Sequence, residues 1–352
     1  MSRKALAAGG LAAAVLALAP GLAAAATRTV IVGADDSTPN APAQFEANRF
    51  LRKTLTIHSG DTVRWRFRAF HTVTVPASGQ APPPFTVPTG FAVAGANDAA
   101  GKPFWFNGTQ PLLQPNPQVA LATKGSTYTG RAYRNSGLPA LPNAKPYRLR
   151  FTRAGTYTYF CAVHPGMRGT VRVVARGKRI PSQRQDTAAG DRELAHLVAL
   201  ARATAAEPAR GAGIVDVGRA PLGRRFSINA FFPSAISVKA GQQLKFTMAG
   251  QNTNEIHTVT LGPVTRAEVP FIAPFSNTIN PIAAYPSDPP PGLPPYVGTN
   301  HGNGFLNAGL QDANPATTSV PSDTSIAFAT PGTYQLKCLV HAGMDATVTV
   351  TP

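Results

Sequence analysis

Cysteine, histidine and methionine occur at one fixed spacing in two distant parts of this 352-residue chain. The spacing is Cys-x-x-His-x-x-Met, and it occurs at Cys161, His164 and Met167 and again at Cys338, His341 and Met344. A further histidine precedes each copy, at His71 and at His257, and both are followed by Thr-Val-Thr. Two imidazoles, a thiolate and a thioether form the donor set expected of a copper site that transfers electrons.

The chemistry of these donors favours copper over zinc. Soft sulfur suits Cu(I) and imidazole suits both oxidation states, whereas zinc gains little from a methionine. A short loop brings the Cys, His and Met of each copy around one point, and a distant strand supplies the other His. We therefore expect two copper sites and no catalytic residue, with the ligands His71, Cys161, His164, Met167, His257, Cys338, His341 and Met344.

The elements that position these residues belong to a duplicated unit, because three segments recur in the same order in both halves. They are Leu55–Gly60, Phe70–Val75 and Gly155–Met167 in the first half, and Ile236–Gly241, Ile256–Leu261 and Gly332–Met344 in the second. Apolar and polar residues alternate over Thr62–Arg68, Thr170–Val174 and Thr347–Val350, which is the period of a half-buried strand. The pattern predicts an all-β chain of antiparallel sandwiches or barrels.

Both units resemble the cupredoxin superfamily of plastocyanin and azurin, and the Cys-x-x-His-x-x-Met loop is similar to that of amicyanin. The resemblance rests on the two ends of each unit, while the long middle stretches depart from the compact members. It implies two Greek-key β-sandwich domains, each with a type 1 (blue) copper ion at one end. It also implies a partly exposed histidine, here His164 or His341, through which electrons pass. The family's ligands fall on the same eight positions, and none is missing.

The chain length and the repeat predict two domains and a linker. We expect a signal peptide over residues 1–26, a first domain over 27–175, a linker over 176–212 and a second domain over 213–352. Apolar residues at helical spacing predict a linker helix over Asp191–Ala206. Proline-rich stretches at 76–145 and 262–320 contain aromatic residues, which favours ordered loops packed over the sandwiches.

Within these stretches we find a weak correspondence. It pairs Asn107 with Asn307 and the Asn-Pro pair at Asn116 with the one at Asn314.

The N-terminus predicts export, because cations precede an apolar run that ends in small residues. We therefore expect a secreted or periplasmic protein with no transmembrane segment. Export also permits disulfides, so a bridge between Cys161 and Cys338 is one alternative for the thiols. A second site that is folded but metal-free is another.

Charge distinguishes the two domains. Residues 27–175 hold 17 basic and 5 acidic residues, net +12, whereas residues 213–352 hold 7 of each. A cationic first domain favours an acidic redox partner or an anionic cell surface, and export argues against nucleic acid.

These features predict a carrier that passes electrons between partner proteins and is not an enzyme. Multicopper oxidases and copper nitrite reductases are also built from cupredoxin domains. They have His-x-His pairs and a Cys beside a His, but here Thr-Val follows both His71 and His257. Oxidase or reductase activity, and copper storage or delivery, stay open as alternatives.

Overall fold

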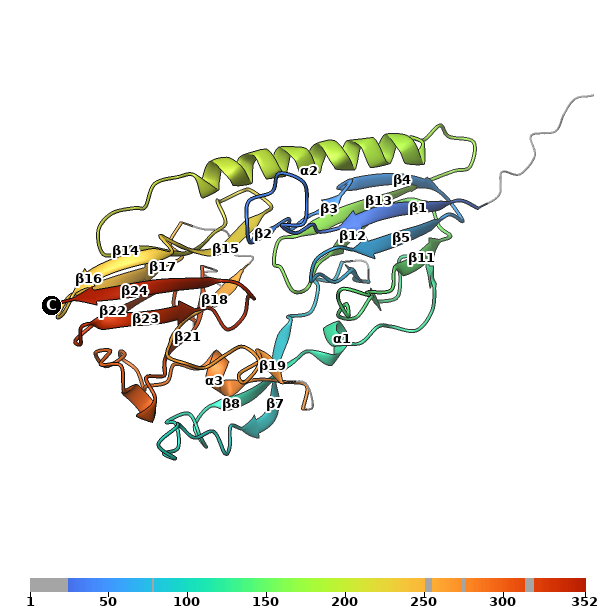
Figure 1. The fold of residues 1–352 in the computed structure, drawn as a ribbon. Coiled ribbons are helices and arrows are strands. Elements are labelled where there is room, and N and C mark those ends of the chain that lie inside the picture. The colour runs from blue at the N-terminus through green and yellow to red at the C-terminus, as the bar shows by residue number, and fades with distance from the viewer. Residues whose placement is uncertain (1–24, 78, 251–254, 274–275, 314–319) are drawn as a thin grey trace, which may run out of the picture.

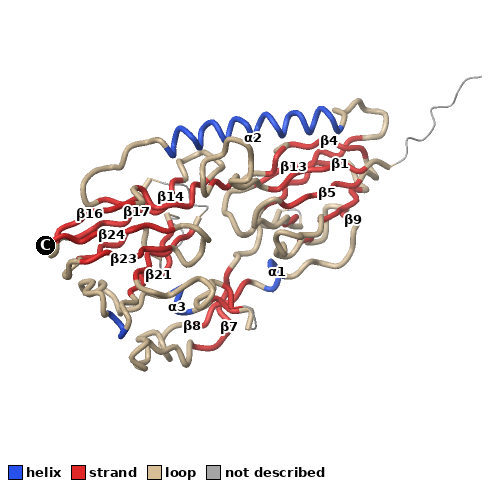
Figure 2. The backbone as a smooth tube through the Cα atoms, viewed as in Figure 1, coloured by secondary structure: helices blue, strands red, loops and turns tan. Residues whose placement is uncertain are grey.

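The computed structural model describes residues 25–77, 79–250, 255–273, 276–313 and 320–352, and most of its regular structure is β-strand (Figures 1 and 2). The predicted signal peptide, except for its last two residues, lies outside the described residues. Two pairs of five-stranded sheets form two β-sandwiches, which we call the N-terminal and the C-terminal sandwich. The all-β sandwich class predicted from the alternating pattern is therefore confirmed.

The N-terminal sandwich consists of two mixed sheets. One has the order β3 (Phe50–Leu51), β1 (Thr27–Val32), β5 (Thr62–Phe67), β11 (Tyr147–Phe151) and β9 (Thr127–Tyr128). The other has the order β10 (Arg134–Asn135), β6 (Thr74–Val75), β12 (Gly155–Phe160), β13 (Arg168–Val174) and β4 (Thr54–His58). An early strand of each sheet runs parallel to a later one, since β1 pairs with β5 and β4 with β13.

The C-terminal sandwich has the same pattern of pairing. One sheet has the order β2 (Phe45–Glu46), β15 (Ser227–Phe232), β14 (Ile214–Arg219), β17 (Gln243–Thr247) and β22 (Asp323–Ala327). The other has the order β16 (Ala235–Lys239), β24 (Asp345–Thr351), β23 (Gly332–Lys337), β18 (Ile256–Leu261) and β21 (Leu306–Asp312). Here too β14 runs parallel to β17, and β16 to β24.

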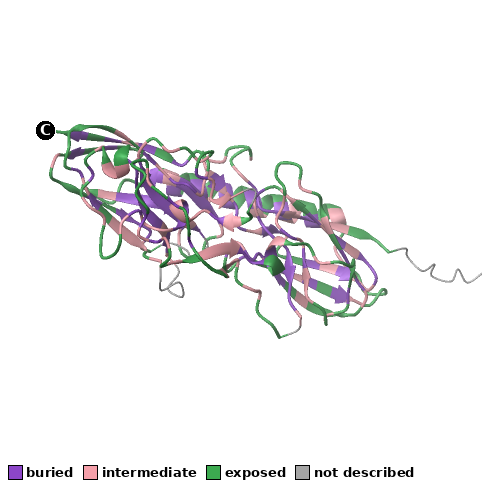
Figure 3. Cartoon of the chain, turned by 90° about the horizontal axis from the view of Figure 1, so that it is seen from below, coloured by how far each residue is buried: buried purple, intermediate pink, exposed green. Residues whose placement is uncertain are grey.

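Each sandwich has its own apolar core, made by the inward residues of both its sheets. Trp65 of β5 is fully buried and packs edge-on against Tyr159 of β12. In the C-terminal sandwich Phe246 of β17 occupies the core together with Leu336 of β23. Figure 3 shows buried residues along the strands of both sandwiches. Alternation alone predicts this arrangement, because successive side chains of a strand point to opposite faces.

One long helix, α2 (Gln183–Ala205), runs along both sandwiches (Figure 1). The predicted helix is confirmed, but it begins eight residues earlier than expected. Ser182 accepts a hydrogen bond from the amide N–H of Gln185, whose side chain accepts one from the Ser182 N–H, and this capping box marks the start. The apolar spacing does not reveal this polar first part. Within the described residues, no helix is both long and apolar enough to cross a membrane.

The segment between β1 and β3 leaves its own sandwich. Its strand β2 pairs with β15 and so completes a sheet of the C-terminal sandwich. Phe45 of β2 packs against Phe226 and lies in one apolar cluster with Leu197 and Val198 of α2. The two sandwiches are therefore joined by a shared sheet and a shared helix, in addition to the linker.

The proline-rich stretches also meet each other. The N-terminal stretch carries β7 (Thr86–Ala92), β8 (Pro111–Pro115) and α1 (Pro117–Ala120); the C-terminal one carries β19 (Ile272–Ala273), β20 (Thr278–Ile279), α3 (Pro281–Ala284) and the 3-10 turn η1 (Asn300–Gly302). Phe104 and Phe305 share a buried cluster, and Trp105 Nε1 donates to the carbonyl oxygen of Pro286 at 2.8 Å. The described parts of both stretches form strands, short helices and buried apolar contacts, as expected, whereas residues 78, 274–275 and 314–319 lie outside the described residues. Each stretch also contacts the opposite one.

Candidate metal centres

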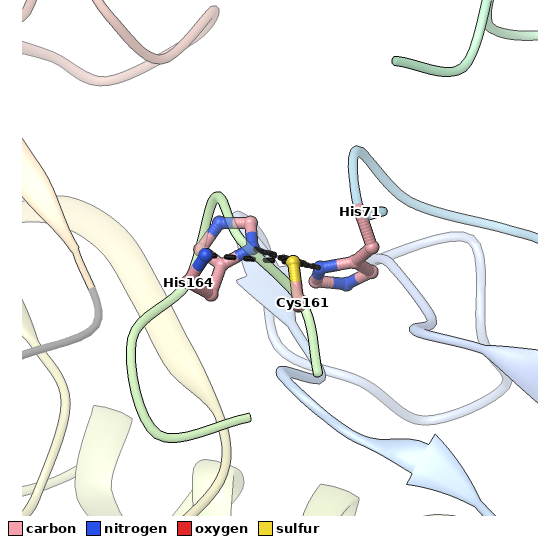
Figure 4. Close-up of side chains that lie close together, drawn as sticks. All are labelled: His71, Cys161 and His164. Carbon is pink, nitrogen blue, oxygen red and sulfur yellow. Dashed lines mark hydrogen bonds between the residues drawn. The ribbon is translucent and has the colours of Figure 1, made fainter. Parts of the chain in front are cut away.

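The strand-to-strand turns bring three of the four predicted ligands of the first copy together. Cys161 directly follows β12, His164 lies in the turn to β13, and His71 lies just before β6, a neighbour of β12 in the sheet. His71 Nδ1 lies 2.8 Å from His164 Nδ1 and 3.8 Å from Cys161 Sγ. Cys161 Sγ lies 3.6 Å from His164 Nδ1. Figure 4 shows these three side chains pointing toward one another.

The second copy has almost the same geometry. Cys338 follows β23, and His257 lies in the neighbouring β18. Cys338 Sγ lies 3.9 Å from His257 Nδ1 and 3.8 Å from His341 Nδ1, and the two Nδ1 atoms are 3.1 Å apart. Two clusters of His, Cys and His therefore form in the described part of the chain, one in each sandwich.

These distances fit a single ion in each cluster. Metal–nitrogen bonds of about 2.0 Å and metal–sulfur bonds of about 2.3 Å, as measured for zinc sites, put ligands of one ion roughly 3–4 Å apart. Five of the six distances in the two clusters, between 3.1 and 3.9 Å, lie in this range, and the sixth, between the Nδ1 atoms of His71 and His164, is slightly shorter at 2.8 Å. The residues present thus fit a soft metal ion.

The methionines close the two loops. The amide N–H of Cys161 donates to the Met167 carbonyl oxygen at 3.0 Å, and that of Cys338 donates to the Met344 carbonyl oxygen at 3.0 Å. Both methionine side chains are buried in the same apolar cluster as the cysteine of their copy. The loop therefore returns to its starting strand at the methionine, where an axial ligand is expected. The role of Met167 and Met344 as ligands stays a prediction.

Backbone amides converge on each sulfur. The amide N–H groups of Thr72 and His164 donate to Cys161 Sγ, both at 3.4 Å. In the second copy the donors to Cys338 are the amides of Thr258 and Val340, again at 3.4 Å. Such donors stabilise a thiolate more than a neutral thiol, because the acceptor carries a full negative charge.

The electrostatics of each cluster also favour a thiolate. Burial raises the pKa of the Cys161 thiol, but the adjoining His164 and His71 rings outweigh it and hold this pKa well below its usual range. The pKa of Cys338 is lowered in the same way by His257 and His341 against the effect of burial. The thiolate is the form of cysteine that binds metals.

The pKa values of the two loop histidines are shifted in the opposite direction, upward. Burial lowers the pKa of His164, but Glu255 and the Cys161 sulfur raise it to about 9. Burial likewise lowers the pKa of His341, and Cys338 and Glu255 raise it to about 10. Negative charge therefore surrounds both loop histidines, which suits a site built for a cation.

Comparisons with known proteins place amicyanin structures beside this chain. The chain is similar to an oxidised amicyanin variant at 21% identity and a TM-score of 0.22, over 42% of this chain and 82% of that one. It is similar to a reduced amicyanin variant at 23% identity and a TM-score of 0.20, over 36% and 73%. No protein-family model and no curated protein sequence matches the chain.

The structure decides two open alternatives about the cysteines and histidines. The alternative of a disulfide is wrong, because Cys161 and Cys338 are free cysteines that lie in separate clusters. The partly exposed loop histidine, expected at His164 or His341, is found at His341 and not at His164, which is only 5% exposed because the C-terminal sandwich covers it. The His341 side chain is 16% exposed and contacts the same covering residue, Glu255.

The sequence does not predict the two glutamates that lie beside the histidines, Glu46 and Glu255. Glu46 Oε1 lies 3.5 Å from His71 Nε2, and Glu255 Oε2 lies 3.8 Å from His164 Nε2. Glu46 and Glu255 both lie far in the sequence from the segments that carry His71 and His164, so no local motif links them to these ligands. Glu255 lies two residues before His257 in the sequence, but its carboxylate also reaches the other sandwich.

The correspondence between the middle stretches was assigned to the wrong residues. The structural partner of Asn307 is Asn135, because each accepts a hydrogen bond from the second threonine after the upstream His, Thr260 or Thr74. Asn107 instead bonds to Ala96 within a hairpin. The repeat Asn-x-Gly-Leu, at 135–138 and 307–310, is the signal that identifies the pair.

The Asn-Pro pairs were also misassigned. Asn116 caps α1 and Asn280 caps α3, each with a proline at the next position, so these two correspond. The pair at Asn314 lies outside the described residues.

Two glycines make room for the upstream histidines. Gly33 follows β1 and Gly218 lies in β14, and both have positive φ angles, +70° and +76°. A Cβ at Gly33 would lie 2.4 Å from His71 Nε2, and one at Gly218 would lie 2.6 Å from His257 Nε2. The repeated Val-x-Val-Gly at 30–33 and 215–218 is the sequence signal for this role.

Gly33→Ala is expected to displace His71 and to weaken copper binding at the first site alone. The clash adds to a backbone strain of about 1–3 kcal/mol for a residue held at positive φ. Copper titration should show one of two sites weakened. Gly101→Ala is the control, because Gly101 has a φ of +78° and a Cβ added there would meet nothing within 4 Å. Equal copper affinity of the two variants would contradict the role of Gly33.

Proposed function

We propose that this protein is an exported electron carrier that binds one copper ion in each of two type 1 sites. The observation that carries the proposal is the convergence of two repeated donor sets, whose nitrogen and sulfur atoms lie within 4.8 Å of one another. The ligands are His71, Cys161, His164 and Met167 in one site and His257, Cys338, His341 and Met344 in the other. Copper would supply one-electron chemistry by cycling between Cu(I) and Cu(II).

The burial of the ligands supports a carrier over an enzyme. Cys161 is 3% exposed and Cys338 is fully buried. A substrate must reach the metal to react, whereas an electron can cross a layer of protein. The residues around each sulfur therefore hold the donor atoms in place and exclude water.

Titration of the purified protein with Cu(II) tests the proposal. We expect two equivalents to bind, with an intense blue absorption that ascorbate bleaches and an outer-sphere oxidant restores. Oxygen uptake with phenolic donors should stay at the level of the buffer. A colourless protein at saturating copper would contradict the assignment, and rapid oxygen uptake would favour an oxidase.

Export is part of the proposal, and its support is the N-terminal sequence. Two cations, an apolar run and three alanines at 24–26 form the pattern of a cleaved secretory signal, so the mature chain would begin at Thr27. We place the protein in the periplasm or outside the cell.

A cationic pocket beside the first site supports an acidic partner for the N-terminal sandwich. Its lining includes Arg49, Lys53, Arg168 and Arg225, next to Gly166 of the His164–Met167 loop. Burial lowers the pKa of Arg225, and the nearby charges of Arg168 and Arg49 lower it further. Crowded positive charges of this kind attract an anionic surface.

A charge reversal in this pocket should change the rate of electron exchange with an anionic reagent. We expect Lys53→Glu combined with Arg168→Glu to slow oxidation of the Cu(I)-loaded protein by hexacyanoferrate(III) several-fold at low salt. The difference should shrink at physiological salt, where charges are screened over about 8 Å. Lys239→Glu, on the C-terminal sandwich, is the matched control. An equal effect of Lys239→Glu would contradict a role for the cationic pocket.

A further inference from the structure

Glu255 lies between the two candidate metal centres. It comes just before β18, the strand that carries His257, and it is 3% exposed. One of its carboxylate oxygens, Oε2, lies 3.8 Å from His164 Nε2 and 3.5 Å from His341 Nε2. A single oxygen atom thus faces a histidine of each sandwich.

The other oxygen of Glu255 anchors the side chain. Oε1 accepts hydrogen bonds from Asn48 Nδ2 at 2.6 Å and from Ser227 Oγ at 2.9 Å. Asn48 belongs to the segment between β1 and β3, and Ser227 begins β15 of the C-terminal sandwich. Residues of both sandwiches therefore hold the carboxylate, and its second oxygen stays directed at the histidines.

The surrounding backbone fixes this arrangement. The amide N–H of Asn48 donates to the carbonyl oxygen of Arg225 at 3.0 Å, and the pairing of β2 with β15 joins the same two segments. These backbone hydrogen bonds join the two sandwiches. His164 and His341 therefore lie at an interface that regular strand pairing holds together.

The imidazole rings of His164 and His341 are oriented in the same way between a cysteine sulfur and Glu255. The Nδ1 atoms of His164 and His341 face the cysteine sulfurs, at 3.6 and 3.8 Å. The Nε2 atom lies on the opposite edge of an imidazole, so both rings present this edge to Glu255. The contacts therefore run from Cys161 through the His164 ring to the Glu255 carboxylate, and from there through the His341 ring to Cys338.

We propose that Glu255 is a positioning residue that couples the two centres, and that electrons pass between them along the His164–Glu255–His341 bridge. This inference rests on the proposed function. In each exchange one copper ion is oxidised and the other is reduced by the same electron, and no atom or proton is transferred. The bridge gives the buried His164 a redox partner inside the chain, in addition to any partner protein that docks at the cationic pocket.

The Cu(I)-loaded protein allows the bridge to be tested without following electron transfer. In the diamagnetic state we expect the Nε2–H protons of His164 and His341 to give slowly exchanging NMR signals. Glu255→Gln keeps the shape of the side chain but removes its negative charge. If the amide oxygen stays with Asn48 and Ser227, an NH2 group faces the two histidines in place of the acceptor oxygen Oε2. Both signals should shift and at least one should exchange faster. Glu268→Gln, an exposed carboxylate of the same sandwich, should move neither.

The rate of internal exchange is the second measurement. Met344→Gln changes the axial position of the second site and thereby its spectrum and potential. In this background, pulse reduction of the Cu(II)-loaded protein should be followed by redistribution of the electron between two distinguishable bands. We expect Glu255→Gln to slow the redistribution at least tenfold while two copper ions stay bound, and Glu268→Gln to leave the rate unchanged.

The outcomes separate this inference from the proposed function. Two blue centres with an unchanged exchange rate and unshifted Nε2–H signals in Glu255→Gln would overturn the coupling and leave the carrier intact. Loss of copper from both sites in Glu255→Gln would also overturn it, since the residue would then maintain the sites themselves. A wild-type chain that binds no copper would overturn both proposals.

Discussion

Cys161→Ser is expected to remove one of the two copper ions and half of the blue absorption, and Cys338→Ser is expected to do the same at the other site. The thiolate is the soft ligand of each set, and a serine hydroxyl neither ionises at neutral pH nor suits Cu(I). Each cysteine lies in a separate cluster with its own pair of histidines, so the two losses should be independent. Copper stoichiometry and visible absorption of the purified variants measure both effects.

The double variant Cys161→Ser with Cys338→Ser is the reference for this experiment and should be colourless. Circular dichroism should show that all three variants keep their strands, because serine is close to cysteine in size. If either single substitution abolished the whole band, the two sites would share one ion, and the assignment of one copper to each sandwich would be wrong.

Asn307→Ala is expected to lower the free energy of unfolding by roughly 3 kcal/mol. The fully buried amide of Asn307 donates to the carbonyl oxygens of Ile282, Ala283 and Tyr285 and accepts from Thr260. Alanine would leave these groups without their partner in a place that water does not reach, and each such group costs about 1–3 kcal/mol. Urea unfolding of the metal-free protein measures the change in free energy.

Two further asparagines provide the comparison. Asn135→Ala should cost a similar amount, because Asn135 is also fully buried and bonds to the carbonyl oxygens of Val119 and Leu121. Asn107→Ala should cost about 1 kcal/mol, because its bonds to Ala96 lie in a partly exposed hairpin. A loss for Asn107→Ala as large as that for Asn307→Ala would contradict the structural pairing.

Asn135 and Asn307 also connect stability to the candidate metal centres. Thr74 and Thr260 lie two residues after Thr72 and Thr258, whose amides donate to the cysteine sulfurs. The buried asparagines therefore tie the middle stretches to the strand segment that shapes each sulfur site. Loosening this link should also weaken copper binding, although less than replacing a ligand.

Local patterns in the sequence determined the strands and the two clusters of His, Cys and His. Alternation with a period of two follows from the pleat of a strand and needs no knowledge of its neighbours. The Cys-x-x-His-x-x-Met spacing spans a single turn, so it holds its donors together whatever surrounds it. For the same reason the sequence predicted the linker helix but missed its first part, which has polar residues and a capping box where apolar spacing was sought.

Only the tertiary structure decided how the two centres relate to each other. The pairing of β2 with β15 joins residues about 180 positions apart and leaves no periodic trace in either segment. Glu255 accepts one hydrogen bond from its own sandwich, donated by Ser227, and one from the segment between β1 and β3, donated by Asn48, and only folding brings these three residues together. Such contacts depend on the burial of whole surfaces against each other. The sequence alone therefore predicts two separate copper sites, and the folded chain places a carboxylate between them.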